Sequence, residues 1–286
     1  MVKIENEYLL IEVNPFGAEL ERIFNKKNGT DYLWRGSDEY WKGKSPILFP
    51  FVGRLKDGKY VYDGKEYEIG IHGFAKRVNF NTHADGDRII CTYDEKNESY
   101  PFSFSLTVSY ILDGQSVIFS SSVKNKDCKT MHYGFGYHPG FNVPLADGLS
   151  FEDYYVFFPE AGKVERKLFG PNFLDSGERV PFGLSDKKLS LTHSLFDNDC
   201  VLLHKAGNIL EIRSDKDDRK IRVSYPEFEN VGLWHSMKTD APFVCIEPWY
   251  SMPGKEGEIT DIEKKEDFIH LPSGCEKTLE IKVEIF

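Results

Sequence analysis

The hydrophobic and polar residues alternate with a period of two in the clearest segments of the chain. In residues 279–285 (LEIKVEI), the apolar side chains Leu279, Ile281, Val283 and Ile285 are separated by charged ones. Because successive side chains of a strand point to opposite faces, this pattern predicts a strand with one face on the core and one in water. No segment longer than about two turns shows the 3.6-residue period of an amphipathic helix.

Short turn motifs separate the predicted strands. Asp63-Gly64 lies between two aromatic-rich segments, and Asp-Gly favours a type I′ turn because both central residues need a positive φ. Similar motifs predict hairpins at Asp85-Gly86, at Asp113-Gly114 and at Ala206-Gly207-Asn208. Many hairpins without helices require a sandwich or a barrel. We therefore predict an all-β protein, a large antiparallel sandwich that occupies residues 1–286 as a single domain.

The amino-acid composition supports this fold class and restricts the possible binding partners. The chain has 22 Phe and 15 Tyr but only seven Ala, a balance that favours strands over helices. Its net charge of −10 argues against sequence-independent binding to nucleic acid, which needs a basic face. No apolar run resembles a signal peptide or approaches the roughly 20 residues that span a membrane. Five widely spaced cysteines without a Cys-x-x-Cys motif are typical of reduced thiols, so we predict a cytoplasmic protein.

Four segments combine glycine, proline and aromatic residues with an ionisable side chain. They contain Arg54 (in FPFVGRL), His72 (in IHGFA), His138 (in GYHPGFN) and Glu247 (in VCIEPWY). Three glycines and a proline around His138 allow close backbone approach and hold its ring, which favours a functional site. The aromatic rings around it also suit the apolar faces of sugars. A lone histidine such as His72 is more often a satisfied structural side chain than a site residue.

Glu247 ends an apolar run that has the character of a buried strand. Burial disfavours the charged form of a carboxylate and raises its pKa, which suits a general base that works near neutral pH. An unpaired buried carboxylate costs stability, so Glu247 needs a partner. Arg54 could be that partner, which would make the two residues a structural ion pair.

Other chemistries lack their sequence signatures. The chain has no Gly-x-Gly-x-x-Gly motif, no Walker loop and no Gly-x-Ser-x-Gly motif, so neither a nucleotide cofactor nor a serine hydrolase is predicted. His72, His138, His235 and Glu247 could contribute metal ligands, but the spacings His-x-His and His-x-x-x-His are absent. We therefore predict no metal and no cofactor.

Six motifs in this order resemble the aldose 1-epimerase (galactose mutarotase) family, and specifically its shorter bacterial branch associated with lactose and tagatose operons. They are GAELERI (17–23), DYLW (31–34), SPILFPFVGRL (45–55), IHGFA (71–75), GYHPGFN (136–142) and CIEPWY (245–250). The resemblance covers roughly residues 5–286. It implies a β-supersandwich of the galactose mutarotase type that interconverts the α and β anomers of hexoses without a cofactor.

The resemblance also implies roles for individual residues. His138 matches the family's general acid and Glu247 its general base, while Arg54 and His72 match sugar-binding side chains. A further sugar-binding aspartate corresponds to Asp197 or to Asp199, depending on the alignment of FDNDCVLL. After Gly-Arg this chain has Lys56-Asp57-Gly58, where galactose-specific relatives have Asn-Arg, so the preferred hexose is left open.

Two alternative functions fit the same fold. A hexose-6-phosphate 1-epimerase would need a cationic pocket for the phosphate, to which Lys76 or Arg77 could contribute. A non-catalytic carbohydrate-binding protein would not need both Glu247 and His138. The expected partner is therefore a hexose or hexose phosphate, with no nucleic acid or membrane, and a homodimer is left open.

Overall fold

The computed structural model describes all 286 residues and consists almost entirely of β-strands. Its only helical segments are four short 3₁₀ turns: η1 (Lys56–Gly58), η2 (Ala75–Arg77), η3 (Phe151–Asp153) and η4 (His193–Phe196). None of these helical segments has the length and hydropathy of a membrane-spanning helix. The all-β prediction is confirmed, and the missing 3.6-residue period corresponds to the missing α-helices.

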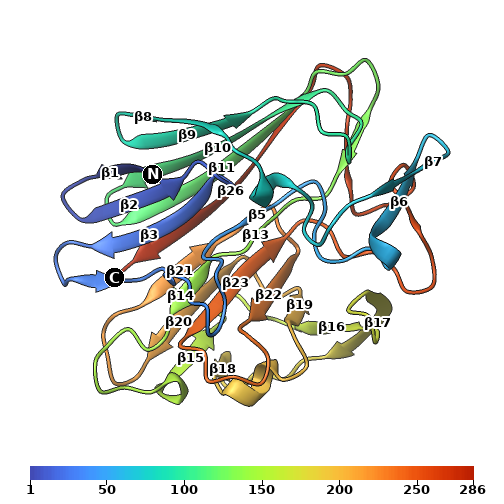
Figure 1. Cartoon of the computed structure of the whole chain (residues 1–286). Coiled ribbons are helices and arrows are strands. Elements are labelled where there is room, and N and C mark those ends of the chain that lie inside the picture. Colours follow the sequence, from blue (N-terminus) through green and yellow to red (C-terminus); the bar gives the residue numbers. More distant parts are fainter.

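The larger of two main sheets has nine strands, which extend from the upper left of Figure 1 to its lower part. In spatial order they are β18 (Lys188–Ser190), β15 (Tyr154–Phe157), β20 (Ile209–Ser214), β21 (Ile221–Ser224), β26 (Glu276–Ile285), β11 (Ser116–Asn125), β10 (Phe104–Asp113), β9 (Arg88–Tyr93) and β8 (Asn81–Asp85). Strands β10, β11 and β26 alternate buried and partly exposed residues, as the period-two pattern predicts.

The second main sheet carries Glu247 on one strand and His138 between two others. Its strands run in the order β17 (Asp175–Pro181), β16 (Glu165–Phe169), β19 (Val201–His204), β22 (Asn230–Trp234), β23 (Phe243–Trp249), β13 (Gly136–Tyr137) and β5 (Ile47–Leu48), and β14 (Gly140–Asn142) also pairs with β23. All strand pairings within this sheet are antiparallel.

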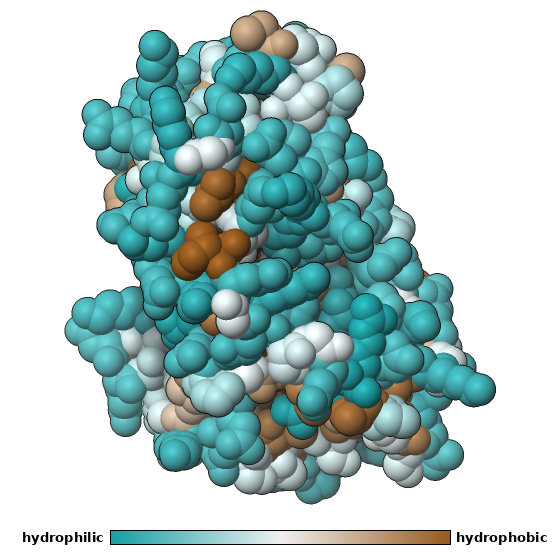
Figure 2. Space-filling view, turned by 90° about the vertical axis from the view of Figure 1, so that its right-hand side faces the viewer, coloured by the Kyte–Doolittle hydropathy of each residue, from teal (hydrophilic) through white to brown (hydrophobic).

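Three small sheets complete the fold. One contains β1 (Val2–Glu5), β2 (Leu9–Asn14), β3 (Glu19–Asn25) and β4 (Thr30–Asp31), the second pairs β12 (Met131–Tyr133) with β25 (Ile269–Leu271), and the third contains β24 (Thr260–Asp261), β6 (Lys59–Tyr62) and β7 (Lys65–Glu68). The face that carries β6, β7 and β17 is largely hydrophilic, with separate small apolar spots rather than one broad patch (Figure 2).

Three of the four predicted hairpins form. Asp63 and Gly64 both have positive φ between β6 and β7, as a type I′ turn requires, and β8–β9 and β10–β11 are also hairpins. The prediction at residues 206–208 is wrong. There β19 ends in one main sheet and β20 begins in the other, because β20 pairs with β15 and β21 instead of β19.

One core of 66 buried residues lies between the sheets. Tyr137, in β13, ties the second main sheet to the first. Its hydroxyl lies 3.2 Å from the Phe119 carbonyl oxygen and 2.9 Å from both the Leu279 carbonyl oxygen and the Ser121 hydroxyl. Since the next residue is His138, these bonds also fix the backbone that presents that histidine.

Candidate active site

Glu247 lies on β23, a strand whose seven residues are all buried. Val244 and Ile246 belong to the main core, so the period of two turns Cys245 and Glu247 to the opposite face. That face borders a cavity of about 290 Å³. Only 2% of the Glu247 side chain is exposed, which places the carboxylate at the floor of the cavity.

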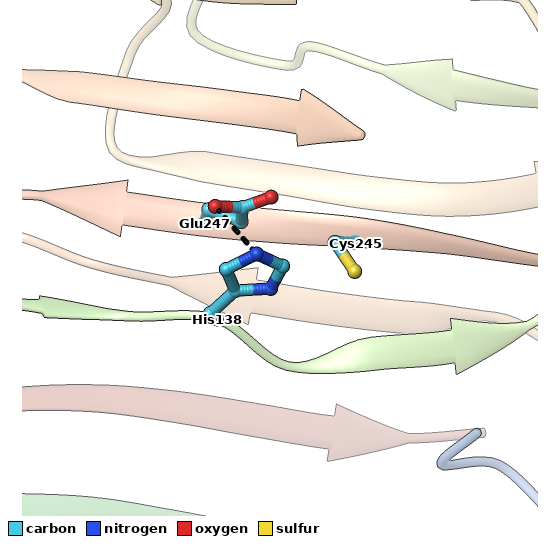
Figure 3. Close-up of side chains that lie close together, drawn as sticks. All are labelled: His138, Cys245 and Glu247. Carbon is cyan, nitrogen blue, oxygen red and sulfur yellow. Dashed lines mark ion pairs between the residues drawn. The ribbon is translucent and has the colours of Figure 1, made fainter. Parts of the chain in front are cut away.

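His138 faces Glu247 because of strand register. Gly136 on β13 pairs with Trp249, and Gly140 on β14 pairs with Cys245, both on β23. Counting inward from these two pairs places residue 138 opposite residue 247, in the short gap between β13 and β14. The imidazole Nε2 lies 3.2 Å from Oε2 of Glu247 (Figure 3).

Aromatic rings hold this pair on two sides. The Trp41 ring stacks on the His138 imidazole with centroids 4.9 Å apart, and Trp234 meets the same imidazole edge-on at 5.5 Å. The indole N–H of Trp249 donates a 3.2 Å hydrogen bond to Oε2 of Glu247. Aromatic packing of this kind fixes the orientation of both groups.

The environment shifts the acid–base properties of both groups. Burial, and secondly the charge of Asp199, hold the pKa of Glu247 well above its ordinary value. Burial, with the charge of Lys76 adding to it, lowers the pKa of His138 to about 3. A desolvated pair in hydrogen-bond contact therefore favours holding one proton between its two members over a wide pH range.

His72 is oriented by a reciprocal pair of bonds with Gly53. The backbone N–H of His72 donates to the Gly53 carbonyl oxygen at 2.9 Å, and the Gly53 N–H donates to Nδ1 of His72 at 3.0 Å. Since Nδ1 accepts, the proton of the neutral ring is on Nε2. Burial lowers the pKa of His72, which keeps the ring neutral. The imidazole lies edge-on to His138, with centroids 5.7 Å apart.

Arg54 also borders the cavity but forms no ion pair with Glu247. Its guanidinium group lies 5.5 Å from the centroid of the Phe173 ring. The structural ion pair between Arg54 and Glu247 is therefore wrong, because His138 and Trp249 are the polar partners of Glu247.

The two aspartate candidates occupy different places. Asp199 precedes β19 with a φ of 72°, and it borders the cavity that contains Glu247. Burial raises its pKa, whereas a hydrogen bond from Trp234 and the charge of Arg54 act in the opposite direction. Asp197 does not border this cavity and faces a neighbouring one.

Sequence reasoning missed part of the cavity wall. Trp41, Trp234 and Phe173 were not singled out, because an isolated aromatic residue in a strand or loop gives no signal that distinguishes a cavity wall from the core. Lys76, considered above only for a phosphate, does border the cavity, whereas Arg77 does not. Lys76 forms no ion pair, and burial lowers its pKa to about 8.

Cys245 brings a third potential metal ligand near the pair. One ligand atom each of His138, Cys245 and Glu247 lie within 4.8 Å of one another (Figure 3). Burial raises the pKa of the Cys245 thiol well above its ordinary value, which disfavours the thiolate that a metal ligand must supply. This donor set therefore fits a proton-transfer site better than a metal site.

Comparison with known families gives the decisive observation. The family model described as "Aldose 1-epimerase" matches residues 1–263. The chain belongs to the aldose 1-epimerase family. This is a family of isomerases, and the membership confirms the resemblance carried by the six motifs.

Related proteins agree with this membership. The plasmid and chromosomal forms of the LacX protein of Lactococcus lactis are each 32% identical over 275 residues, which is 91% of this chain and 91% of theirs. A galactose mutarotase related enzyme of Lactobacillus acidophilus superposes with a TM-score of 0.94 at 30% identity, covering 100% of this chain and 97% of the other. A galactose mutarotase-like protein of Lactobacillus casei gives the same score and identity, with 100% of both chains covered. The predicted galactose mutarotase-like fold is thereby confirmed.

Proposed function

We propose that this protein interconverts the α and β anomers of a hexose, with Glu247 as general base and His138 as general acid. The observation that carries the proposal is the contact between Nε2 of His138 and Oε2 of Glu247, 3.2 Å apart at the aromatic-walled floor of a cavity. Family membership supports the reaction class.

Opening of the sugar ring needs one base at the anomeric hydroxyl and one acid at the ring oxygen. In the tautomer that has the shared proton on His138, Glu247 takes the proton of the anomeric hydroxyl while His138 gives its proton to the ring oxygen, and the C1–O5 bond breaks to give the open aldehyde. After rotation about C1–C2, the same transfers run backwards, and O5 attacks the other face of the carbonyl carbon. Both residues return to their initial states, so one proton shared by the pair suffices. Each group contributes typically about 10²–10⁴-fold to the rate.

The remaining wall residues supply sugar-binding groups. Nε2–H of His72 and the Arg54 guanidinium are donors, and the carboxylate of Asp199 is an acceptor for sugar hydroxyls. Because the donors are held by backbone and ring contacts before the substrate binds, they can also stabilise negative charge that develops on sugar oxygens. We assign the aspartate role to Asp199, which borders the cavity, and not to Asp197.

Variants of the acid and the base test this mechanism. Glu247→Gln keeps the size of the side chain and His138→Asn keeps a polar one, and each should lower kcat/KM for anomer exchange by about 10²–10⁴-fold. Exchange is measured by NMR on galactose and glucose, and circular dichroism checks folding. Glu211→Gln serves as the control, since it removes a buried carboxylate from the nine-stranded sheet, outside the cavity.

The outcomes separate the candidate functions. Wild-type exchange rates in either cavity variant would refute the acid–base assignment. Tight hexose binding by the wild-type protein without accelerated exchange would instead indicate a non-catalytic carbohydrate-binding protein. Unfolding of both cavity variants, but not of the control, would make the pair structural.

One observation favours a phosphorylated sugar as an alternative substrate. Lys76 borders the cavity and has no carboxylate partner, so its ammonium group is available to an anionic substituent. Competition between glucose 6-phosphate and free hexoses in the same exchange assay measures this preference. If the phosphate is recognised, Lys76→Met should raise KM for glucose 6-phosphate about tenfold more than KM for glucose.

A further inference from the structure

A separate cavity lies between the β16–β17 hairpin, at the lower right of Figure 1, and the segment of residues 252–267. Its volume is about 490 Å³, which is within the range of small-molecule sites. It shares no wall residue with the cavity that contains His138 and Glu247, nor with the neighbouring cavity that Asp197 borders. Five of its 13 wall residues are basic and five are acidic, so the cavity suits an ionic ligand.

Lys167, on β16, is the only buried charged residue of this cavity. Its exposed fraction is 8%, and its ammonium group forms no ion pair and no hydrogen bond within the chain. It pairs in register with Leu202 of β19, whose side chain packs with Trp249 and Met252, so the lysine lies on the same face of the sheet as this apolar cluster. An unpaired charge in such a position costs stability unless an anion neutralises it.

Arg179 adds a second positive charge directly opposite Lys167 in the register of β16 and β17. Side chains in this position share a face of the sheet, and like charges there destabilise it. Burial, and secondly the charge of Arg179, lower the pKa of Lys167. The guanidinium group has one ion pair, at 3.7 Å from Glu165, which leaves most of its five N–H donors for a ligand. An anion between Lys167 and Arg179 would therefore compensate both charges.

The acidic residues of the segment 252–267 already have other partners. Asp267 forms an ion pair with Lys265 at 2.8 Å and accepts the backbone N–H of Met252 at 2.5 Å. Asp261 forms an ion pair with Lys264 at 2.6 Å. The charge of Asp267 raises the pKa of Lys167, but the two groups are not within ion-pair distance. The two remaining acids, Glu258 and Glu266, are exposed, so water and salt screen their charges.

Asp175 joins the two walls of the cavity and is held in place by its own bonds. Its backbone N–H donates to the Gly254 carbonyl oxygen at 2.9 Å, and its carbonyl oxygen accepts the Glu256 N–H at 3.0 Å. Its side chain accepts the Gly177 N–H at 2.9 Å, which turns the carboxylate toward its own turn. Since these bonds tie the segment 252–267 to β17, the cavity is formed before a ligand binds.

We propose that this cavity binds a small phosphate monoester, with Lys167 and Arg179 as the two cations that contact the phosphate group. A phosphate monoester has a charge of about −1.5 to −2 at pH 7 and three acceptor oxygens, so it matches two cations, whereas a carboxylate has only one negative charge. The Arg179 fork suits two phosphate oxygens at once, and the Lys167 ammonium acts as a point charge. The remaining volume of the cavity accommodates the organic part of the ligand.

Titration calorimetry at constant ionic strength tests the proposal with glycerol 3-phosphate, inorganic phosphate and acetate. Glycerol 3-phosphate should bind at one site, more tightly than inorganic phosphate and much more tightly than acetate. Lys167→Met should raise its Kd about tenfold, the effect of one lost charged hydrogen bond, and Arg179→Gln severalfold. Lys124→Met, which removes an exposed lysine of β11 that has no ion pair, is the control and should leave Kd unchanged.

Urea unfolding distinguishes a ligand-binding lysine from a structural one. Lys167→Met keeps an apolar side chain of similar length and removes an unpaired buried charge, so the urea midpoint without phosphate should not fall. Glycerol 3-phosphate should raise the midpoint of the wild-type protein and have a smaller effect on Lys167→Met. A marked fall of the midpoint in Lys167→Met, with Kd unchanged in Arg179→Gln, would make Lys167 structural and overturn the proposal.

Lys76→Met separates this cavity from the sugar site, since Lys76 borders only the latter. The Kd of glycerol 3-phosphate should be unchanged in this variant. Weaker binding in Lys76→Met but not in Lys167→Met would place the phosphate at the sugar site and overturn the proposal. Equal effects of Lys167→Met and Lys124→Met, equal affinity for acetate, or no saturable binding would also overturn it. Tighter binding of inorganic phosphate than of glycerol 3-phosphate would refute the choice of a monoester.

Discussion

Substitution of Gly73 by alanine tests how the loop that carries His72 is held. His72 and Gly73 have consecutive positive φ values of 62° and 70°, and the Gly73 backbone lies against the carbonyl group of Phe49. A Cβ atom added at Gly73 would lie 2.2 Å from the Phe49 carbonyl oxygen and 2.5 Å from its carbon. Real side chains do not approach so closely, so the alanine must push the two segments apart.

The loss of unfolding free energy expected for Gly73→Ala has two parts. A left-handed conformation costs an L-residue about 1–2 kcal/mol. The Phe49 carbonyl oxygen also accepts the N–H groups of Phe74 and Ala75 at 3.0 and 3.2 Å, and losing both bonds costs about 1 kcal/mol each. We therefore expect Gly73→Ala to lower the free energy of unfolding by about 3–4 kcal/mol. Gly86 is the matched control, since its φ is 61° but no atom lies within 4 Å of an added Cβ. Gly86→Ala should cost only the first part, about 1–2 kcal/mol.

Urea unfolding measures the free energies, and NMR anomer exchange measures the catalytic effect. In Gly73→Ala, displacement of His72 by about 1 Å should lower kcat/KM by about 10²-fold. In Gly86→Ala, kcat/KM should be unchanged. Equal unfolding free energies for the two variants would refute the steric reasoning. A destabilised Gly73→Ala variant with normal exchange would refute the link between this loop and the sugar site.

Two further predictions concern charge. Anomer exchange should become slower at high pH, where the His138–Glu247 pair loses its shared proton. The negative charge of Asp199 raises the pKa of Glu247, so Asp199→Asn should move this loss of activity to lower pH. The positive charge of Lys76 lowers the same pKa, so Lys76→Met should move the loss to higher pH. Shifts of kcat/KM profiles in the same direction would contradict this reasoning. Glu211 is 1% exposed and forms ion pairs with two partly exposed arginines. Glu211→Gln should lower the free energy of unfolding by about 2 kcal/mol, measured by urea unfolding with an unchanged m value. A change below about 0.5 kcal/mol would show that the pairs contribute little.

Much of the fold could be predicted because its signals are local. The alternation in residues 279–285 describes the inner and outer faces of β26, and the Asp63-Gly64 turn has the positive φ values that its residues favour. The turn at residues 206–208 resembles a hairpin equally well. Which sheet the following strand joins depends on distant partners, and a local motif contains no information about them.

Local signals of this kind predict only part of the candidate site. Glu247 and His138 lie in short distinctive segments, and the register of β23 brings them together. The choice between Asp197 and Asp199 depends on the path of a loop, where a shift of two residues moves the carboxylate to another cavity. Arg54 forms no ion pair, and its guanidinium group lies beside the neutral ring of Phe173, which no local sequence signal could predict.

The position of His138 opposite Glu247 has a consequence for how this protein can change. The proposed acid and base are both placed by the hydrogen-bonding of one central strand, whereas Arg54, Lys76 and Asp199 come from loops and turns. Loops can lengthen or exchange residues without altering the separation between the proton donor and the proton acceptor. Substrate preference can therefore vary while the proton transfers are conserved. In contrast, insertion of a single residue between Gly136 and Gly140 would shift the register and separate the pair.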